Sequence, residues 1–181
     1  MTDSPTSCKR RRLVERALSY HRLNEHSVHN KVKTKTEVII EADRNTVWRL
    51  FNSPDELHRW QPTLKSITHR SGTPAETGEV SELVYVEKGR EVTITQTMIE
   101  RRDPDFVAAV YVSRWGKALI VNHFEVIDDN TTQWMAYANH TFTGMMRLGG
   151  LFVGKSIRER AAADMNRFKL VVETEVAENR R

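Results

Sequence analysis

Residues 79–101 read EVSELVYVEKGREVTITQTMIER. In the second half of this stretch Val92, Ile94 and Met98 fall on one parity, and threonine occupies the positions between them. Such alternation predicts a β-strand that buries one face and leaves the other wetter. The Lys88-Gly89 pair marks a turn before it, so the two runs are expected to form an antiparallel hairpin.

The same pattern of short runs and turn signals extends in both directions from this hairpin. Six strands are predicted in total, at about 64–71, 79–88, 90–101, 105–113, 118–127 and 131–142. Most gaps are shorter than the dozen residues that a parallel crossover requires, so the sheet is expected to be an antiparallel meander. Residues 33–42, centred on Val38-Ile39-Ile40, predict one further strand and bring the sheet to about seven.

Helices are predicted at two places outside this meander. After the first strand, Asp43 and Ser53 are candidate N-caps of two short helices, the second beginning at Pro54 and ending near Trp60. At the C-terminal end, residues 145–174 carry an apolar stripe with helical spacing. Its members are Ile157, Ala161, Met165, Phe168 and Val172. A stripe of this kind has to be buried, and the sheet is the large surface available for it. The fold class is therefore α+β.

Composition and charge limit the classes of protein to which this chain can belong. The chain has 181 residues, of which 39% are hydrophobic and 29% charged, typical of one globular domain. No apolar run is long enough to span a bilayer, and no secretory signal follows the first basic cluster, so stable membrane insertion is not expected and the cytoplasm is the predicted location. The lone Cys8 agrees with a reducing compartment.

The basic character of the chain is confined to residues 1–32. This segment holds seven basic residues against three acidic ones, which accounts for the whole net charge of +4. The remaining residues are neutral overall, which argues against nucleic-acid binding by the folded body. Leu13, Ala17, Leu18 and Tyr20 hint at a short helix. Two interpretations of the segment stay open: a flexible extension, or a device that docks onto an anionic surface or a partner.

Residues 149–156, Gly-Gly-Leu-Phe-Val-Gly-Lys-Ser, match the phosphate-loop pattern GxxxxGK[ST]. That motif requires a strand before it, a helix after it and a parallel sheet that supplies a magnesium ligand. Only one predicted helix follows Ser156, so nucleotide binding is not expected. The glycines are interpreted as a flexible turn into the long helix.

The order of these elements and four local motifs resemble a known superfamily. Residues 41–48, Glu-Ala-Asp-Arg-Asn-Thr-Val-Trp, resemble its opening motif, and Trp60-Gln61-Pro62, Asp103-Pro104 and residues 147–151 resemble three later ones. The chain is similar to the START-like, polyketide cyclase/dehydrase and lipid-transport (SRPBCC) superfamily over about residues 33–175. The resemblance implies a helix-grip fold, in which a curved antiparallel sheet wraps around the C-terminal helix, with 1–32 as an extension and 176–181 as a tail.

The resemblance also implies a function and a site. Members bind lipids, polyketides or other small hydrophobic molecules in a cavity between sheet and helix, and some use it as cyclases, aromatases or dehydratases. No cofactor is implied. The candidate ligand-binding residues are Trp60, Tyr85, Met98, Tyr111, Asn122, Phe124, Trp134, His140, Met146, Phe152, Met165 and Phe168. Pockets of this kind are mostly apolar with few polar groups. The same aromatic and methionine residues would equally fill a solid core.

Parity places His140 on the face of Trp134, which the resemblance directs toward the cavity. This histidine is a weak candidate for a general base and otherwise a hydrogen-bonded structural residue. The histidines lack metal-ligand spacing and a single cysteine adds little, so no metal site is expected. Whether the chain is a binding module, an enzyme or an interaction protein with a solid core stays open, with a binding module preferred. A homodimer is possible.

Overall fold

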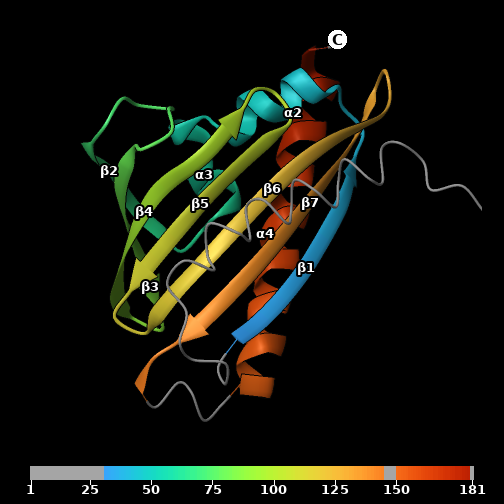
Figure 1. Ribbon diagram of the computed structural model, residues 1–181. Coiled ribbons are helices and arrows are strands. Elements are labelled where there is room, and N and C mark those ends of the chain that lie inside the picture. Colours follow the sequence, from blue (N-terminus) through green and yellow to red (C-terminus); the bar gives the residue numbers. More distant parts are fainter. Residues whose placement is uncertain (1–30, 145–149, 180–181) are drawn as a thin grey trace, which may run out of the picture.

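The computed structural model describes residues 31–144 and 150–179, without the side chains of 150–153. Within these ranges seven strands form one antiparallel sheet in the order β1-β7-β6-β5-β4-β3-β2. The strands are β1 (Lys31–Ile40), β2 (Leu64–Ser71), β3 (Val80–Glu87), β4 (Arg90–Arg102), β5 (Phe106–Ser113), β6 (Gly116–Asp128) and β7 (Thr131–Phe142). Figure 1 shows the sheet curving around a single long helix. The predicted six-strand antiparallel meander is confirmed, and so is the further strand predicted at residues 33–42.

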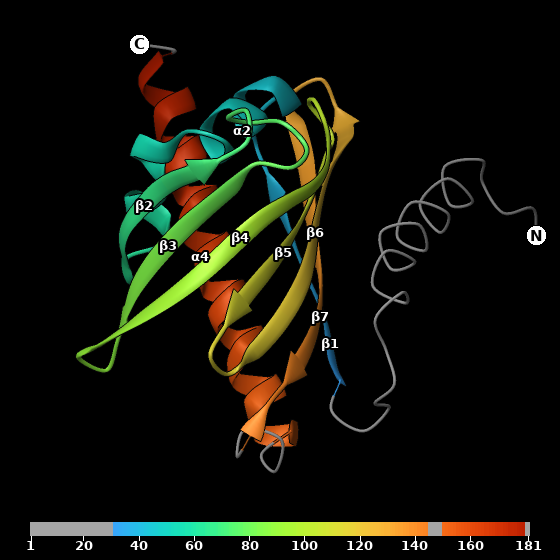
Figure 2. The same ribbon diagram turned by 60° about the vertical axis from the view of Figure 1, so that its left-hand side comes forward.

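The helices lie on the concave side of the sheet (Figures 1 and 2). They are α2 (Arg44–Phe51), the 3₁₀ turn η1 (Pro54–Glu56), α3 (Leu57–Trp60) and α4 (Gly150–Asn179). Asp43 caps α2 as predicted, because its carboxylate accepts hydrogen bonds from the backbone N–H groups of Asn45 and Thr46. The helix-grip fold expected from the sequence is confirmed.

Three local expectations are corrected by the structure. The side chain of Ser53 makes no capping hydrogen bond, because the chain enters a 3₁₀ turn in which the Glu56 N–H bonds to the Ser53 carbonyl. The first strand begins at Lys31, inside the predicted extension. Helix α4 continues to Asn179, so residues 176–179 form its last turn rather than a tail. Residues 1–30 and Met146 lie outside the described residues, as does the side chain of Phe152.

The GxxxxGK[ST] segment does not form a phosphate loop. Residues 150–156 are the first turns of α4, and the sheet beside them is antiparallel. Gly154 is therefore helical instead of providing a flexible turn. A Cβ atom at Gly154 would lie 2.9 Å from Cγ1 of Val32 on β1. The absence of a side chain at this position lets α4 pack closely on the edge strand.

The close approach of Gly154 to Val32 leads to a prediction about the stability of the domain. Gly154→Ala is expected to destabilise the domain by about 1 kcal/mol, because overpacking costs about 1–3 kcal/mol and the gain in helix propensity returns about 1 kcal/mol. In a Val32→Ala background the clash is removed, so the same substitution should stabilise. Urea unfolding of the four proteins of this double-mutant cycle measures the difference. Equal stabilisation in both backgrounds would show that the approach is not tight.

Candidate functional site

Side chains on the concave face form rows that run across the strands. Trp134 of β7 lies beside Phe124 of β6, and two residues further along β7 Ala136 lies beside Asn122. Continuing toward the end of β7, Ala138 pairs with Ile120 and His140 with Ala118. The His140 row continues across Ala118 to Tyr111 of β5 and Gln96 of β4. The face therefore divides into a half centred on Trp134 and a half centred on the row of His140.

The half centred on Trp134 is closely packed. The ring centroid of Phe51 lies within 6.0 Å of those of Trp60, Phe124, Trp134 and Phe168. Helix α4 adds Met165, Phe168 and Val172 to this cluster, each no more than 3% exposed. Packing at this density leaves little room for a guest molecule. We call this group, together with Ile40, Trp48 and Met98 of the same cluster, the aromatic core.

Half of the predicted ligand-binding residues belong to the aromatic core. They are Trp60, Met98, Phe124, Trp134, Met165 and Phe168. Asn122 borders it, is 7% exposed, and accepts a 3.0 Å hydrogen bond from Nε1 of Trp134. Its amide oxygen is thus engaged within the protein. In these positions the side chains fill the space between sheet and helix. This matches the alternative in which the aromatic and methionine residues form a solid core.

The half centred on the His140 row is packed differently. Nine inward-facing side chains of this half, from the strands and from α4, are only half-buried, whereas Leu83, Ala109 and Ala118 among them are buried. The nine are Tyr85, Ile94, Gln96, Tyr111, Ile120, Ala138, His140, Ile157 and Ala161. We call these nine residues the open half. Three of the predicted ligand-binding residues, Tyr85, Tyr111 and His140, come together here.

Burial shifts the pKa values of the three titratable groups of the open half. Burial raises the pKa of Tyr111 to about 12, and burial also raises the pKa of Tyr85. Burial lowers the pKa of His140, because the imidazolium form loses hydration. At neutral pH all three side chains are therefore uncharged. They can exchange hydrogen bonds with a neutral polar group but offer no fixed charge to an ion.

His140 has the least satisfied polar atom of the open half. Its Nε2 is buried and has no hydrogen-bond partner among the described residues. The ring stacks on Phe142 with centroids 5.9 Å apart and planes 3° from parallel. A buried polar atom without a partner costs about 1–3 kcal/mol relative to a satisfied one. The ring is held by an apolar contact while one nitrogen keeps its hydrogen-bonding capacity.

Polar contacts near Tyr85 join α4 to β3 and to the residues that precede β2. The Tyr85 hydroxyl donates a 2.7 Å hydrogen bond to Oε1 of Gln61, and the guanidinium of Arg160 lies 5.6 Å from the centre of the Tyr85 ring. Arg160 also donates to Oγ1 of Thr63 at 2.7 Å and pairs with Glu87. Sequence reasoning missed Arg160 and Gln61, because their contacts join positions far apart in the chain and leave no local pattern.

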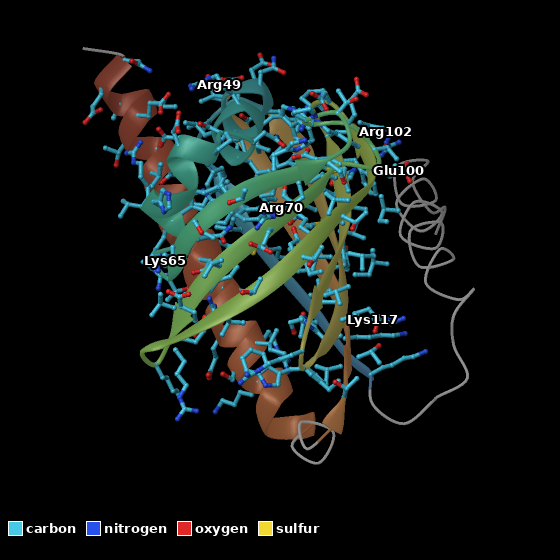
Figure 3. All side chains as sticks on the ribbon, turned by 90° about the vertical axis from the view of Figure 1, so that its left-hand side faces the viewer. Arg49, Lys65, Arg70, Glu100, Arg102 and Lys117 are labelled. Atoms are coloured by element: carbon cyan, nitrogen blue, oxygen red, sulfur yellow. The ribbon has the colours of Figure 1, made fainter. Side chains whose placement is uncertain are left out.

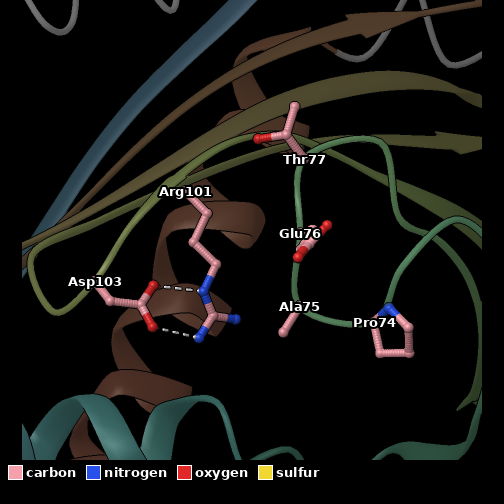
Figure 4. A pocket seen from close by; sticks show the side chains of 6 residues that line it. All are labelled: Pro74, Ala75, Glu76, Thr77, Arg101 and Asp103. Atoms are coloured by element: carbon pink, nitrogen blue, oxygen red, sulfur yellow. Dashed lines mark hydrogen bonds and ion pairs between the residues drawn. The ribbon is translucent and has the colours of Figure 1, made fainter.

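A hollow shown in Figure 4 lies between the loop after β2 and the end of β4. It is lined by Pro74, Ala75, Glu76, Thr77, Arg101 and Asp103. Nε and Nη2 of Arg101 donate to the Asp103 carboxylate at 2.6 and 3.0 Å, which holds the pKa of that carboxyl below its usual range. The cation is thus already neutralised, and the lining is mostly polar. This hollow suits an apolar guest poorly.

Two further properties bear on function. In residues 31–144 and 150–179, no group of three histidine, cysteine or acidic side chains is arranged to hold a metal ion. None of the described helices is both long and apolar enough to cross a bilayer.

Comparison with known proteins places these features in context. A family model described as polyketide cyclase / dehydrase and lipid transport matches residues 31–173. Curated protein sequences give no match. Among solved structures, Ara h 8.0201 superposes with a TM-score of 0.66 at 11% identity, covering 80% of this chain and 99% of its own. An aromatase/cyclase, ZhuI from Streptomyces sp. R1128, gives 0.68 at 13% identity, with coverage of 81% and 96%. A Staphylococcus aureus protein of unknown function gives 0.69 at 14%, with coverage of 83% and 99%.

Proposed function

We propose that this chain, which belongs to the polyketide cyclase / dehydrase and lipid transport family, binds a small hydrophobic molecule in a cavity between α4 and the open half of the sheet. One observation carries the proposal. The nine side chains of the open half are only half-buried, and burial shifts the pKa values of the three among them that titrate, Tyr85, Tyr111 and His140, whereas the aromatic core beside them is closely packed. Side chains that are enclosed yet still accessible are those that line a hollow.

The walls of the proposed cavity are mainly apolar. Ile94, Ile120 and Ala138 supply the sheet side, and Ile157 and Ala161 supply the helix side. Burial of apolar ligand surface against them would contribute roughly 25 cal/mol per Å² before the entropy cost of binding. Members of the aromatic core would then form the floor of the cavity and fix the distance between sheet and helix. This assigns the predicted site residues two different roles.

The polar end of the ligand would meet His140 and Tyr111. His140 is neutral, and its Nε2, which is buried and has no partner among the described residues, would reach the ligand after a small rotation of the ring; the raised pKa of Tyr111 keeps its hydroxyl protonated. Neither group stabilises an ion, so the geometry favours a hydroxyl or carbonyl on the ligand over a carboxylate. Arg160 is engaged with Glu87 and Thr63 at the edge of the sheet. It would form part of the rim and not the wall.

This preference can be measured with two probes that differ by one hydroxyl group. 2-Naphthol is expected to bind about fivefold more tightly than naphthalene, because one net hydrogen bond is worth about 1 kcal/mol. His140→Phe should reduce the preference to near unity while leaving the affinity for naphthalene almost unchanged. Fluorescence titrations of the wild type and the variant give the ratio.

The matched control is His69→Phe, which removes an imidazole on β2 that is 42% exposed. It should leave both affinities unchanged. A hydroxyl preference that survives His140→Phe would remove His140 from the site. Failure of both probes to bind the wild type would contradict the cavity itself.

A cyclase or dehydratase is the second candidate function, and the state of His140 is the observation that favours it. A neutral imidazole with a free nitrogen is a competent general base, and a protonated tyrosine in the same row is a competent acid. An enzyme of this kind would show a bell-shaped pH dependence that His140→Phe removes. A binding protein would take up the probe and release it unchanged.

A further inference from the structure

We propose that one end of the domain docks on the surface of an anionic lipid bilayer. This end consists of the β3–β4 and β5–β6 turns, the start of β1 and the first turns of α4. Figures 1 and 2 show these parts together at the lower end of the molecule. We call it the basic end. The docking does not depend on the ligand-binding function proposed above.

Strand pairing fixes the position of the basic end. Gly116 at the start of β6 pairs with Ser113 at the end of β5 and with Phe142 at the end of β7. The antiparallel order then puts the start of β1 and the β3–β4 turn at the same end of the sheet. The close approach of Gly154 to Val32 brings the first turns of α4 there as well.

Cations are in excess at the basic end. Six of its lysine and arginine side chains make no ion pair with a carboxylate in the described part of the chain, and all of them except Lys117 are exposed. They are Lys33 of β1, Lys88 and Arg90 at the β3–β4 turn, Arg114 in the β5–β6 turn, Lys117 of β6 and Arg158 of α4. Their charges are available to a partner.

Glutamates at the basic end do not cancel this excess, because each of them is already paired with another basic side chain. The pairs are Glu87 with Arg160, Glu91 with Lys65 and Glu159 with Lys155. Cations near the opposite end are paired as well, for example Arg49 with Glu175. The unpaired positive charge is therefore concentrated where the strands and α4 meet at the basic end.

The opposite end of the sheet differs in charge. Asp128 and Asp129 lie at the β6–β7 turn there. Figure 3 shows Glu100 and Arg102 toward that end and Lys117 toward the basic end. The folded body is thus neutral in sum but polarised along the strands. A surface of negative potential would turn the basic end toward itself.

Apolar side chains lie among these cations. Val86 near the end of β3 is 39% exposed, and Val112 near the end of β5 is 48% exposed. In the β5–β6 turn, the guanidinium of Arg114 lies 4.4 Å from the centre of the Trp115 ring. Tryptophan concentrates in the headgroup region of bilayers, where basic side chains meet anionic lipids. A nucleic acid would use the cations but leave the valines in water, so a bilayer fits this surface better.

Docking by the basic end would place the open half next to the bilayer. His140 is two residues from the last residue of β7, and Ile157 lies in the first turns of α4. An apolar ligand would then pass between bilayer and cavity with little exposure to water. This consequence rests on the proposed function, whereas the docking itself rests on the charges and apolar side chains of the basic end.

Co-sedimentation of the full chain with phosphatidylglycerol-rich vesicles tests the docking. Each cation near an anionic surface contributes about fivefold to binding, so Arg90→Gln combined with Arg158→Gln should weaken it about 25-fold. Arg49→Gln combined with Arg59→Gln makes the same charge change on α2 and α3. This control should weaken binding less than about twofold, because both side chains lie away from the bilayer. Both double variants keep the basic residues of 1–32.

Tryptophan fluorescence reports which part of the domain touches the lipid. Trp115 is the one tryptophan of the basic end, whereas Trp48, Trp60 and Trp134 belong to the aromatic core. Anionic vesicles with brominated acyl chains should quench part of the fluorescence of the wild type. Trp115→Phe should remove this quenching without weakening sedimentation more than severalfold.

Three results would overturn the proposal. The first is an equal loss of binding in the two double variants, which would assign the vesicle contact to net charge or to residues 1–32. The second is quenching that persists in Trp115→Phe, and the third is equal binding to vesicles of phosphatidylcholine alone. Vesicle docking by a protein that fails to bind 2-naphthol would support the proposal and contradict only the ligand-binding function.

Discussion

Phe168→Ala is expected to lower the free energy of unfolding by about 3–5 kcal/mol, enough to unfold much of the domain at moderate temperature. Phe168 is fully buried and contacts three other aromatic rings, those of Phe51, Trp60 and Trp134. Truncation leaves a cavity at the point where α4 meets the sheet. The loss combines the transfer free energy of the ring with the cost of the empty space.

Leu170→Ala provides the control on the same helix. Leu170 is 67% exposed, so its truncation should change stability by less than about 0.5 kcal/mol. Urea unfolding followed by tryptophan fluorescence reports on both variants, because Trp48, Trp60 and Trp134 lie in the aromatic core. A Phe168→Ala protein as stable as Leu170→Ala would show that the aromatic core does not hold the helix on the sheet.

The second large effect is expected on binding. Ala138→Trp should weaken 2-naphthol binding at least tenfold, a loss of about 1.4 kcal/mol or more. Ala138 lies on the concave face between Ala136 and His140 and is half-buried, and its neighbour across β6 is Ile120. An indole placed there would occupy the space that we assign to the ligand. Because it would enter a hollow, the stability of the domain should change little.

The same substitution separates a hollow from a solid core. Forcing a large side chain into packed protein costs typically about 1–3 kcal/mol of stability. Gln133→Trp adds the same side chain to the opposite face of β7, where Gln133 pairs with Ile39, and should leave binding intact. Strong destabilisation of Ala138→Trp, with the binding of 2-naphthol unchanged, would favour the solid-core alternative.

Local sequence patterns predicted most of the fold. Alternation such as that from Val92 to Met98 identifies strands because each side chain faces either the core or water. The gaps between strands are too short for crossovers, which dictated antiparallel pairing. Capping by Asp43 was predictable because its carboxylate acts within its own turn. Gly154 was misread, since its role depends on Val32, far away in the chain.

The candidate site could be predicted only in part. Parity along β7 correctly placed Trp134 and His140 on one face, but parity does not tell how far along the strand the packing changes. The change depends on α2 and α3, which bring Phe51 and Trp60 against Phe168 at one end only. The contact of Arg160 with Tyr85 likewise depends on the path of α4 across the sheet. Such facts arise from tertiary structure and leave no periodic signal.

Intermolecular NOEs between 2-naphthol and methyl-labelled protein locate the bound molecule within the fold. We expect NOEs from the probe to methyl groups of Ile120, Ala138 and Ile157 in the open half, with none to Val172 or Ile40 in the aromatic core. This pattern would place the probe between α4 and the His140 row. NOEs confined to the outer surface, or no NOEs under saturating probe, would contradict a binding cavity between sheet and helix.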